Sequence, residues 1–178
     1  MNFRNTCLWL LSIFLILGIF SCTQEDDCYV PRSVYAKFGF KSRDSLINYD
    51  VNGRDSSKLI IADTPLYYPS FSSKGTPQDI KIMADANRAI YMSVPLNPDA
   101  DSINYLFQPN SDTPIIDSIT IFYSHKYHFI SNNCGYTYYY NIDSLKYSKL
   151  IIDSIGINKS EITQNATDQN LYLFFYKR

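Results

Sequence analysis

The sequence predicts an all-β protein, built as an antiparallel β-sandwich with two packed sheets in an immunoglobulin-like arrangement. Three observations predict this class. Apolar and polar residues alternate with a period of two in many short segments, turn-forming residues separate these segments, and no segment has a convincing amphipathic helical pattern. Six to nine short strands are therefore expected. A small closed β-barrel is the alternative architecture.

The first part of the domain predicts three strands and a loop. In residues 33–40 the apolar side chains alternate and share one face of a strand. A second strand covers residues 46–51 and ends at Asn52-Gly53, a strong turn dipeptide. A third strand covers residues 59–62. Residues 64–77 are rich in Pro, Ser and Gly, which predicts a long loop or the edge of a sheet.

The remaining part predicts a hairpin and then a series of strands. Residues 79–84 and 88–94 have the pattern of two strands joined by a turn at 85–87. Residues 150–157 are ambiguous, because they are rich in β-branched Ile but also fit the spacing of a helix. The other expected strands are residues 102–108, 116–124, 127–131, 136–142 and 171–176.

A short hydrophobic leader precedes the domain. Residues 1–21 carry a charged start and an apolar run that is too short to span a bilayer, as in a secretory signal peptide. Ile19-Phe20-Ser21-Cys22 resembles a bacterial lipobox, which implies that Cys22 is acylated and becomes the new N-terminus. An ordinary signal peptide with an incidental cysteine is the alternative. We therefore expect a leader over residues 1–21, a tether over 22–32 and a single domain over 33–178.

The tether begins with an acidic run that bears on localisation. Glu25, Asp26 and Asp27 follow the lipidated position and resemble the acidic export signal of surface lipoproteins in Bacteroidota. The resemblance implies a lipid-anchored protein of the outer membrane, exposed at the cell surface. The periplasmic face of that membrane is the alternative, with the acidic run as a plain solvated tether.

Charge and cysteine content limit the possible partners and cross-links. The chain has net charge −1 and its leader holds only Arg4, so the mature chain carries −2 and is not expected to bind nucleic acid. Two cysteines besides Cys22 remain after processing, Cys28 and Cys134. In an oxidising envelope they are expected to form a disulfide. Two buried free thiols are the alternative.

Asp-Ser followed by an aliphatic residue occurs five times in the chain. This triplet resembles the O-glycosylation acceptor motif of exported Bacteroidota proteins. The alternative is structural, because Asp and Ser favour turns and the aliphatic residue then begins a strand. The candidate acceptor residues are Ser45, Ser102, Ser118, Ser144 and Ser154.

Aromatic residues supply the candidate ligand site, and no catalytic or metal site is predicted. Tyr136, Tyr138 and Tyr140 share one face of an expected strand, where they could stack on a sugar or a partner or pack under a loop. His125 and His128 are three residues apart, which sends them to opposite faces of a strand and disfavours a shared metal. No phosphate-binding loop, calcium loop or dinucleotide motif is present, so no cofactor is expected.

Several segments resemble a family of small Bacteroidota lipoproteins known only as a domain of unknown function. The segments are Cys28, Val94-Pro95-Leu96-Asn97, Asp117-Ser118-Ile119-Thr120-Ile121 and Ile130-Ser131-Asn132-Asn133-Cys134-Gly135. The resemblance implies an envelope β-domain, supports Cys28 and Cys134 as a pair, and supplies no catalytic residue. The leading hypothesis is a non-enzymatic binding or accessory subunit of an envelope complex. A surface glycan-binding module is the second hypothesis, and a hydrolase using His125 or His128 is the third.

Overall fold

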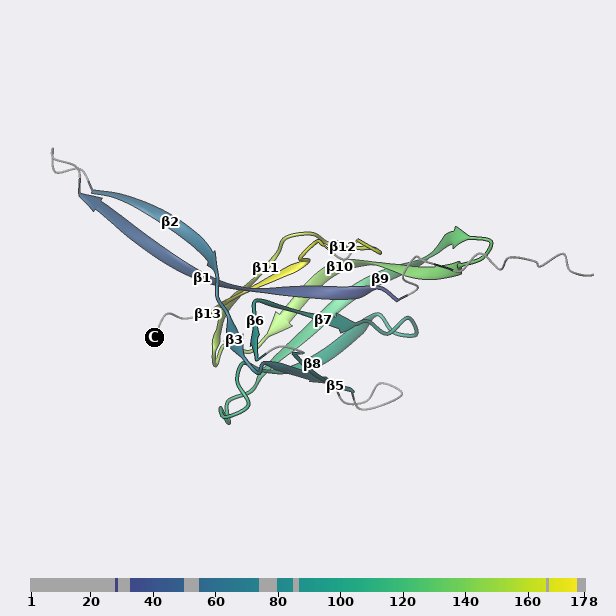
Figure 1. The fold of residues 1–178 in the computed structure, drawn as a ribbon, viewed down its shortest axis with the longest axis horizontal. Helices are drawn as coiled ribbons and strands as arrows, with labels where there is room; N and C mark the ends of the chain where they lie inside the picture. The colour runs from purple at the N-terminus through teal and green to yellow at the C-terminus, as the bar shows by residue number, and fades with distance from the viewer. Residues whose placement is uncertain are drawn as a thin grey trace, which may run out of the picture.

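The computed structural model describes residues 28, 33–49, 55–73, 80–84, 87–165 and 167–175. Every regular element within these residues is a β-strand, so the predicted all-β class is confirmed. Two main sheets pack face to face as a sandwich (Figure 1). Among the residues that the structure describes, neither sheet closes on itself, so they form a sandwich and not the alternative closed barrel.

The first sheet is built around one long strand. Strand β1 (Tyr35–Tyr49) pairs along its first half with β7 (Tyr91–Pro95) and along its second half with β2 (Asp55–Asp63). On its other side β1 pairs with β13 (Leu171–Phe175), which also pairs with β11 (Ile152–Ile157). The β1–β13 pair is parallel, whereas the other pairs of this sheet are antiparallel.

The second sheet has six antiparallel strands. Its order is β12 (Glu161–Ile162), β10 (Gly135–Tyr147), β9 (Asp117–Ser131), β8 (Ser102–Gln108), β4 (Ser70–Ser73) and β5 (Ile80–Met83). Strands β3 (Leu66–Tyr67) and β6 (Arg88–Ala89) form a separate two-stranded antiparallel sheet.

Aromatic side chains from both sheets fill the core between them. Phe38 of β1 lies 4.9 Å from Phe71 of β4, and Phe71 lies 4.8 Å from Phe107 of β8, measured between ring centroids. All three side chains are fully buried. Each buried aromatic ring removes a large apolar area from water, so this cluster is a main source of the sandwich's stability.

The predicted hairpin of residues 79–84 and 88–94 is wrong. Strand β5 pairs with β4 in the second sheet, and β7 pairs with β1 in the first sheet. The two segments are therefore neighbours in sequence that belong to opposite layers. Alternation identifies each strand correctly, but it carries no information about which strand will be its partner.

The predicted loop over residues 64–77 is also wrong in part. It contains β3 and β4, and the Phe71 side chain of β4 is fully buried in the core. Ser70 and Ser73 are buried around it. The Ser-rich composition of this segment resembles a loop, but β4 is held in the sandwich by pairing with β5 and β8 and by the burial of Phe71.

Two strands are longer than the sequence predicts, and one ambiguity is resolved. The expected strands at residues 116–124 and 127–131 form the single strand β9, and those at 33–40 and 46–51 both lie within β1 where the structure describes them. Residues 152–157 form strand β11, so the helical alternative is wrong.

Candidate functional site

Two hairpins extend beyond the packed sandwich at opposite ends of the molecule. The β9–β10 hairpin projects from one end and the β1–β2 hairpin from the other (Figure 1). Both are continuations of core strands, so their direction is set by the sheets themselves. We call the second of these, residues 43–49 of β1 with their partners in β2, the β1–β2 ribbon.

One face of the β9–β10 hairpin carries exposed aromatic rings. The register places Tyr127 opposite Tyr138 and Phe129 opposite Tyr136, with ring centroids 4.4 Å and 5.1 Å apart. We call these four side chains the aromatic face. Tyr127 is 72% exposed, Tyr136 65% and Phe129 49%. Such contiguous exposed apolar surface is typical of an interaction site.

The aromatic face continues the buried face of the same strand. Residues Ile119, Ile121 and Tyr123 of β9 point into the core, and alternation puts Tyr127 and Phe129 on that same side. A hydrogen bond joins the hydroxyl groups of Tyr138 and Tyr127 and raises the pKa of Tyr138. The Tyr127 and Tyr138 rings therefore hold each other in position in the absence of a ligand.

Tyr140 belongs to the core and is a correction to the expected ligand site. It shares a face with Tyr136 and Tyr138, as predicted, but it is only 5% exposed and its ring lies 5.5 Å from that of Tyr123. Its hydroxyl donates to the Leu96 carbonyl at 3.4 Å. Burial raises the pKa of Tyr140 to about 12. Only Tyr136 and Tyr138 of the predicted trio are available to a ligand.

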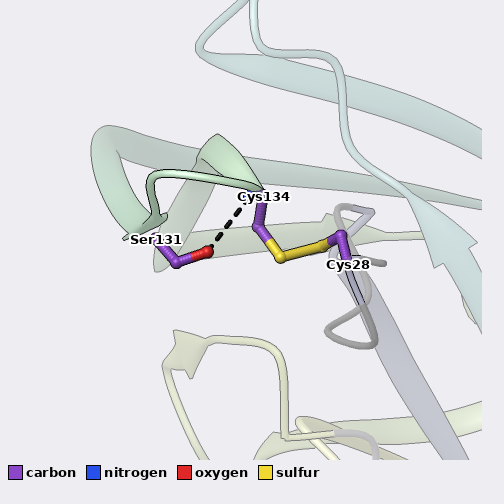
Figure 2. The surroundings of a disulfide bond; sticks show 3 residues. All are labelled: Cys28, Ser131 and Cys134. Carbon is purple, nitrogen blue, oxygen red and sulfur yellow. Dashed lines mark hydrogen bonds between the residues drawn. A yellow bond between two sulfur atoms is a disulfide. The ribbon is translucent and has the colours of Figure 1, made fainter. Parts of the chain in front are cut away.

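A disulfide joins the start of the chain to the turn of this hairpin. Cys28 and Cys134 are bonded with their Cα atoms 5.1 Å apart, which is the expected pairing. The Ser131 hydroxyl accepts a hydrogen bond from the Cys134 N–H at 3.0 Å, and Gly135 follows with φ of 72° (Figure 2). The Ser131 side chain and the left-handed Gly135 thus shape the turn, and the disulfide joins Cys28 to it.

The base of the β1–β2 ribbon is braced against β13. The Arg43 guanidinium lies 3.8 Å from the centre of the Phe174 ring and 3.7 Å from Asp153 Oδ2. Lys41 lies 4.7 Å from the Tyr172 ring and forms an ion pair with Asp63. Cation–π contacts of this kind are worth about 0.5–2 kcal/mol each. These contacts fix the base of the ribbon against β13.

Strand β2 of the ribbon exposes apolar side chains close to the braced base and has an open edge. Leu59 is 60% exposed and Ile61 52% exposed. Strand β2 pairs with β1 on one side, and within the described residues no strand pairs with its other side. The sequence could not reveal this feature, since the expected strand at 59–62 looks like any half-buried strand.

Asp117 is a buried anchor that the sequence did not single out. Its Oδ1 accepts hydrogen bonds from the Ser148 hydroxyl and from the Leu150 N–H at 2.8 Å. Its Oδ2 accepts from the N–H groups of Ile151 and Ile152, at 2.8 Å and 2.9 Å. Burial alone would raise the pKa of this carboxyl, but the four hydrogen bonds outweigh it and lower the pKa.

A family model covers most of the sandwich. The model of DUF6452, a family of unknown function, matches residues 70–175. The chain belongs to this family. The match runs from β4 to the end of β13, so it includes the β9–β10 hairpin and leaves out β1 and β2. No curated protein and no solved structure matches the chain. The expected family of unrecorded activity is confirmed, while lipoprotein status and a Bacteroidota origin stay predictions.

The two histidines of this DUF6452 protein lie on opposite faces of β9, as predicted from their spacing. His125 packs 5.5 Å from the Tyr138 ring, whereas His128 stacks on the Tyr139 ring at 4.0 Å. His125 lines an open hollow of about 220 Å³ that Ser124 and Glu161 also line. However, the Ser124 hydroxyl donates to Asp143 at 3.4 Å, and adjacent residues of a strand point to opposite faces.

The geometry therefore favours no triad at this hollow. A Ser-His-acid triad needs a histidine hydrogen-bonded to the nucleophile and oriented by the acid. Glu161 instead lies 3.9 Å from the Lys126 ammonium. Within the described residues, no three His, Cys, Asp or Glu side chains come together as a metal site. None of the described residues forms a helix that could cross a membrane.

The candidate glycosylation serines differ in accessibility. Ser102 and Ser144 are exposed, whereas Ser118 and Ser154 are half-buried. The side chain of Ser45 lies outside the described residues. Asp117, which precedes Ser118, is fully buried, so the structural explanation holds for that copy of the motif. Glycosylation stays a prediction, with Ser102 and Ser144 as the most accessible acceptors.

Proposed function

We propose that this DUF6452 protein is a lipid-anchored, non-enzymatic binding or accessory subunit of an outer-membrane complex. In this proposal Cys22 carries the lipid, and the β1–β2 ribbon contacts an envelope protein partner. The domain faces the cell surface, with the periplasmic side as the alternative. The observation that carries the proposal is the braced ribbon. It projects from the sandwich, and its strand β2 has exposed apolar side chains and an open edge.

An open edge strand supports a binding role for physical reasons. Its unpaired N–H and C=O groups can take up a strand from another chain, and proteins usually shorten, charge or cover such edges to prevent this. Here Leu59 and Ile61 are exposed beside the edge, where they would add apolar contact to backbone pairing. The contacts of Arg43 to Phe174 and Asp153 hold the ribbon in place before binding, which lowers the ordering cost.

A pair of leucines provides a matched test of the ribbon. Leu59 and Leu150 are 60% and 62% exposed, but Leu150 lies outside the ribbon, between β10 and β11. Wild-type protein, Leu59→Glu and Leu150→Glu would be purified from gently solubilised membranes, and co-purified proteins would be quantified. We expect one partner to be recovered with wild type and Leu150→Glu and to fall about tenfold or more with Leu59→Glu.

Two outcomes contradict this proposal. A wild-type protein that runs as a monomer without any co-purified partner argues against an accessory role. Equal recovery of the partner with Leu59→Glu and with wild type argues against the ribbon as its contact. The anchor is tested separately, since fatty-acid label is expected to enter the wild type, and Cys22→Ala is expected to leave the membrane fraction.

Glycan binding is the second candidate, and the exposed Tyr136 beside the half-buried Tyr138 is the observation in its favour. Aromatic rings with a polar hydroxyl can stack on a sugar face. The chain's only Trp is Trp9 in the leader, so the mature chain lacks the strongest stacking residue. Screening on a glycan array tests this role. Absence of binding, or binding that is unchanged in Tyr138→Ala, contradicts it.

A further inference from the structure

We propose that the aromatic face of the β9–β10 hairpin rests on the lipid surface that carries the anchor. Tyr127, Phe129 and Tyr136 would lie in the headgroup region of the bilayer. This inference rests on the proposed acylation of Cys22 and adds to it a second, non-covalent membrane contact. It also assigns an occupant to three exposed aromatic rings on one face of the hairpin.

The length of the tether limits how far the hairpin turn can be from the membrane. Six residue steps separate Cys22 from Cys28, and an extended chain spans at most about 3.3–3.6 Å per residue, or ~20 Å in total. The disulfide adds a Cα–Cα distance of 5.1 Å to Cys134. The hairpin turn is therefore held within ~25 Å of the acylated residue.

This limit selects one end of the molecule. Strand β9 has 15 residues, which corresponds to about 50 Å at ~3.3 Å per residue. Only the end of β9 near Cys134 can therefore lie close to the anchor. Phe129 and Tyr136 are paired directly behind the turn, and Tyr127 and Tyr138 are the next pair on the same face. The aromatic face thus lies at the end of the hairpin that the tether keeps within reach of the membrane.

The composition of this end suits the interfacial region of a bilayer. Residues 127–140 contain no Asp, Glu, Lys or Arg, so no formal charge has to be brought towards the lipid. Tyrosine is enriched at membrane interfaces, because its ring is apolar and its hydroxyl stays hydrated. The turn itself offers Asn132 and Asn133, which are polar and uncharged. Glu25, Asp26 and Asp27 of the tether lie at this same end but are not attracted to lipid, so the contact would add the rings to the acyl chains of Cys22.

The opposite end of the molecule is consistent with this orientation. The β1–β2 ribbon lies at the end remote from the disulfide and the β9–β10 turn (Figure 1). With the aromatic face on the lipid, the ribbon points away from the membrane carrying the anchor. A partner in the same complex could then reach its open edge.

A single introduced Trp tests the inference in the acylated, leader-free protein, which contains no other Trp. Tyr136→Trp places the probe on the aromatic face, and Tyr67→Trp on β3 is the control with 56% exposure of the native side chain. Both proteins would be reconstituted in phosphatidylethanolamine and phosphatidylglycerol vesicles with a brominated lipid. We expect Tyr136→Trp emission to shift to the blue and to be quenched about twofold or more, and Tyr67→Trp to be unaffected.

Flotation of the same vesicles separates failure of this inference from failure of the anchor. Protein that does not float with the vesicles contradicts acylation. Protein that floats while Tyr136→Trp stays accessible to aqueous iodide and unquenched by brominated lipid overturns the inference, and leaves the face open to a glycan or a protein. Adding Cys134→Ser to Tyr136→Trp is expected to preserve flotation and to weaken the quenching, because the hairpin is then no longer tied to the tether.

Discussion

Replacing Asp117 by Asn is the most direct test of how the sandwich is held together. The carboxylate accepts four hydrogen bonds, two on each oxygen, from the segment that links β10 to β11. Asparagine keeps one oxygen and replaces the other with an NH₂ group. The amide loses least with its oxygen towards Ile151 and Ile152 and its NH₂ towards Ser148 and Leu150. There the NH₂ group can donate to the Ser148 hydroxyl but opposes the Leu150 N–H, so one hydrogen bond is lost and the others lose their charge assistance.

The expected cost follows from the burial of these groups. A buried donor without a partner costs about 1–3 kcal/mol. Ile152 is fully buried, whereas Leu150 is 62% exposed, so water can reach part of the segment and reduce the penalty. We expect Asp117→Asn to lower the free energy of unfolding by about 1–3 kcal/mol. This is a large share of the ~5–15 kcal/mol that stabilises a typical domain.

The pH dependence of this effect has a definite sign. The pKa of Asp117 is lowered in the folded protein, so the unfolded chain binds the proton more tightly. The carboxylate therefore contributes its full stabilisation above the ordinary pKa of about 3.9, and loses it as pH falls through the lowered folded value. The stability difference between wild type and Asp117→Asn should narrow below about pH 4.

Urea unfolding followed by circular dichroism, at neutral and acid pH, measures both effects. Asp101→Asn is the matched control, because Asp101 is exposed and begins another Asp-Ser-Ile triplet. We expect that control to lie within about 0.5 kcal/mol of wild type. An Asp117→Asn protein as stable as the control would refute the anchoring role. A stability difference that does not change in acid would refute the assigned charge state.

Three further changes test other parts of the fold by the same unfolding assay. Phe71→Ala should cost about 3–5 kcal/mol, because its ring contacts Phe38 and Phe107 across the core, and a loss below 1 kcal/mol would mean that β4 is not part of the sandwich. Gly135→Ala should cost about 1 kcal/mol from backbone strain alone, since φ is 72° and an added Cβ meets no atom within 4 Å. Cys134→Ser should cost up to ~4.7 kcal/mol for a loop of 106 residues. No difference between reduced and oxidised wild type would contradict that last estimate.

Period-two alternation could predict the class and most of the strands, because each strand buries one face against the opposite sheet. It could not predict partners. Strands β5 and β7 are close in sequence and lie in different layers, since pairing is decided by which backbone edges meet after the chain crosses the sandwich. The parallel β1–β13 pair joins residues more than 130 positions apart, which no local pattern can indicate.

The candidate site was only partly predictable for a related reason. The sequence could place Tyr136, Tyr138 and Tyr140 on one face, but not show where the opposite sheet ends. That boundary separates the buried Tyr140 from the exposed Tyr136. Likewise, five similar Asp-Ser triplets could not reveal that Asp117 alone among the described copies is fully buried, because its role depends on a segment about 30 residues further along the chain.

Strand continuity gives the two ends of the molecule a fixed relation. Strand β1 passes from core positions such as Phe38 into the ribbon, and β9 passes from core positions such as Ile121 into the aromatic hairpin. Each hairpin therefore starts from a strand whose other end is packed in the core, although the β9–β10 ladder shifts register between Ile142 and Ser144. The core packing between Phe38 and Phe71 joins the sheet that carries the β1–β2 ribbon to the sheet that carries the aromatic hairpin. Fixing the β9–β10 turn through the disulfide would therefore also fix the direction in which the β1–β2 ribbon is presented.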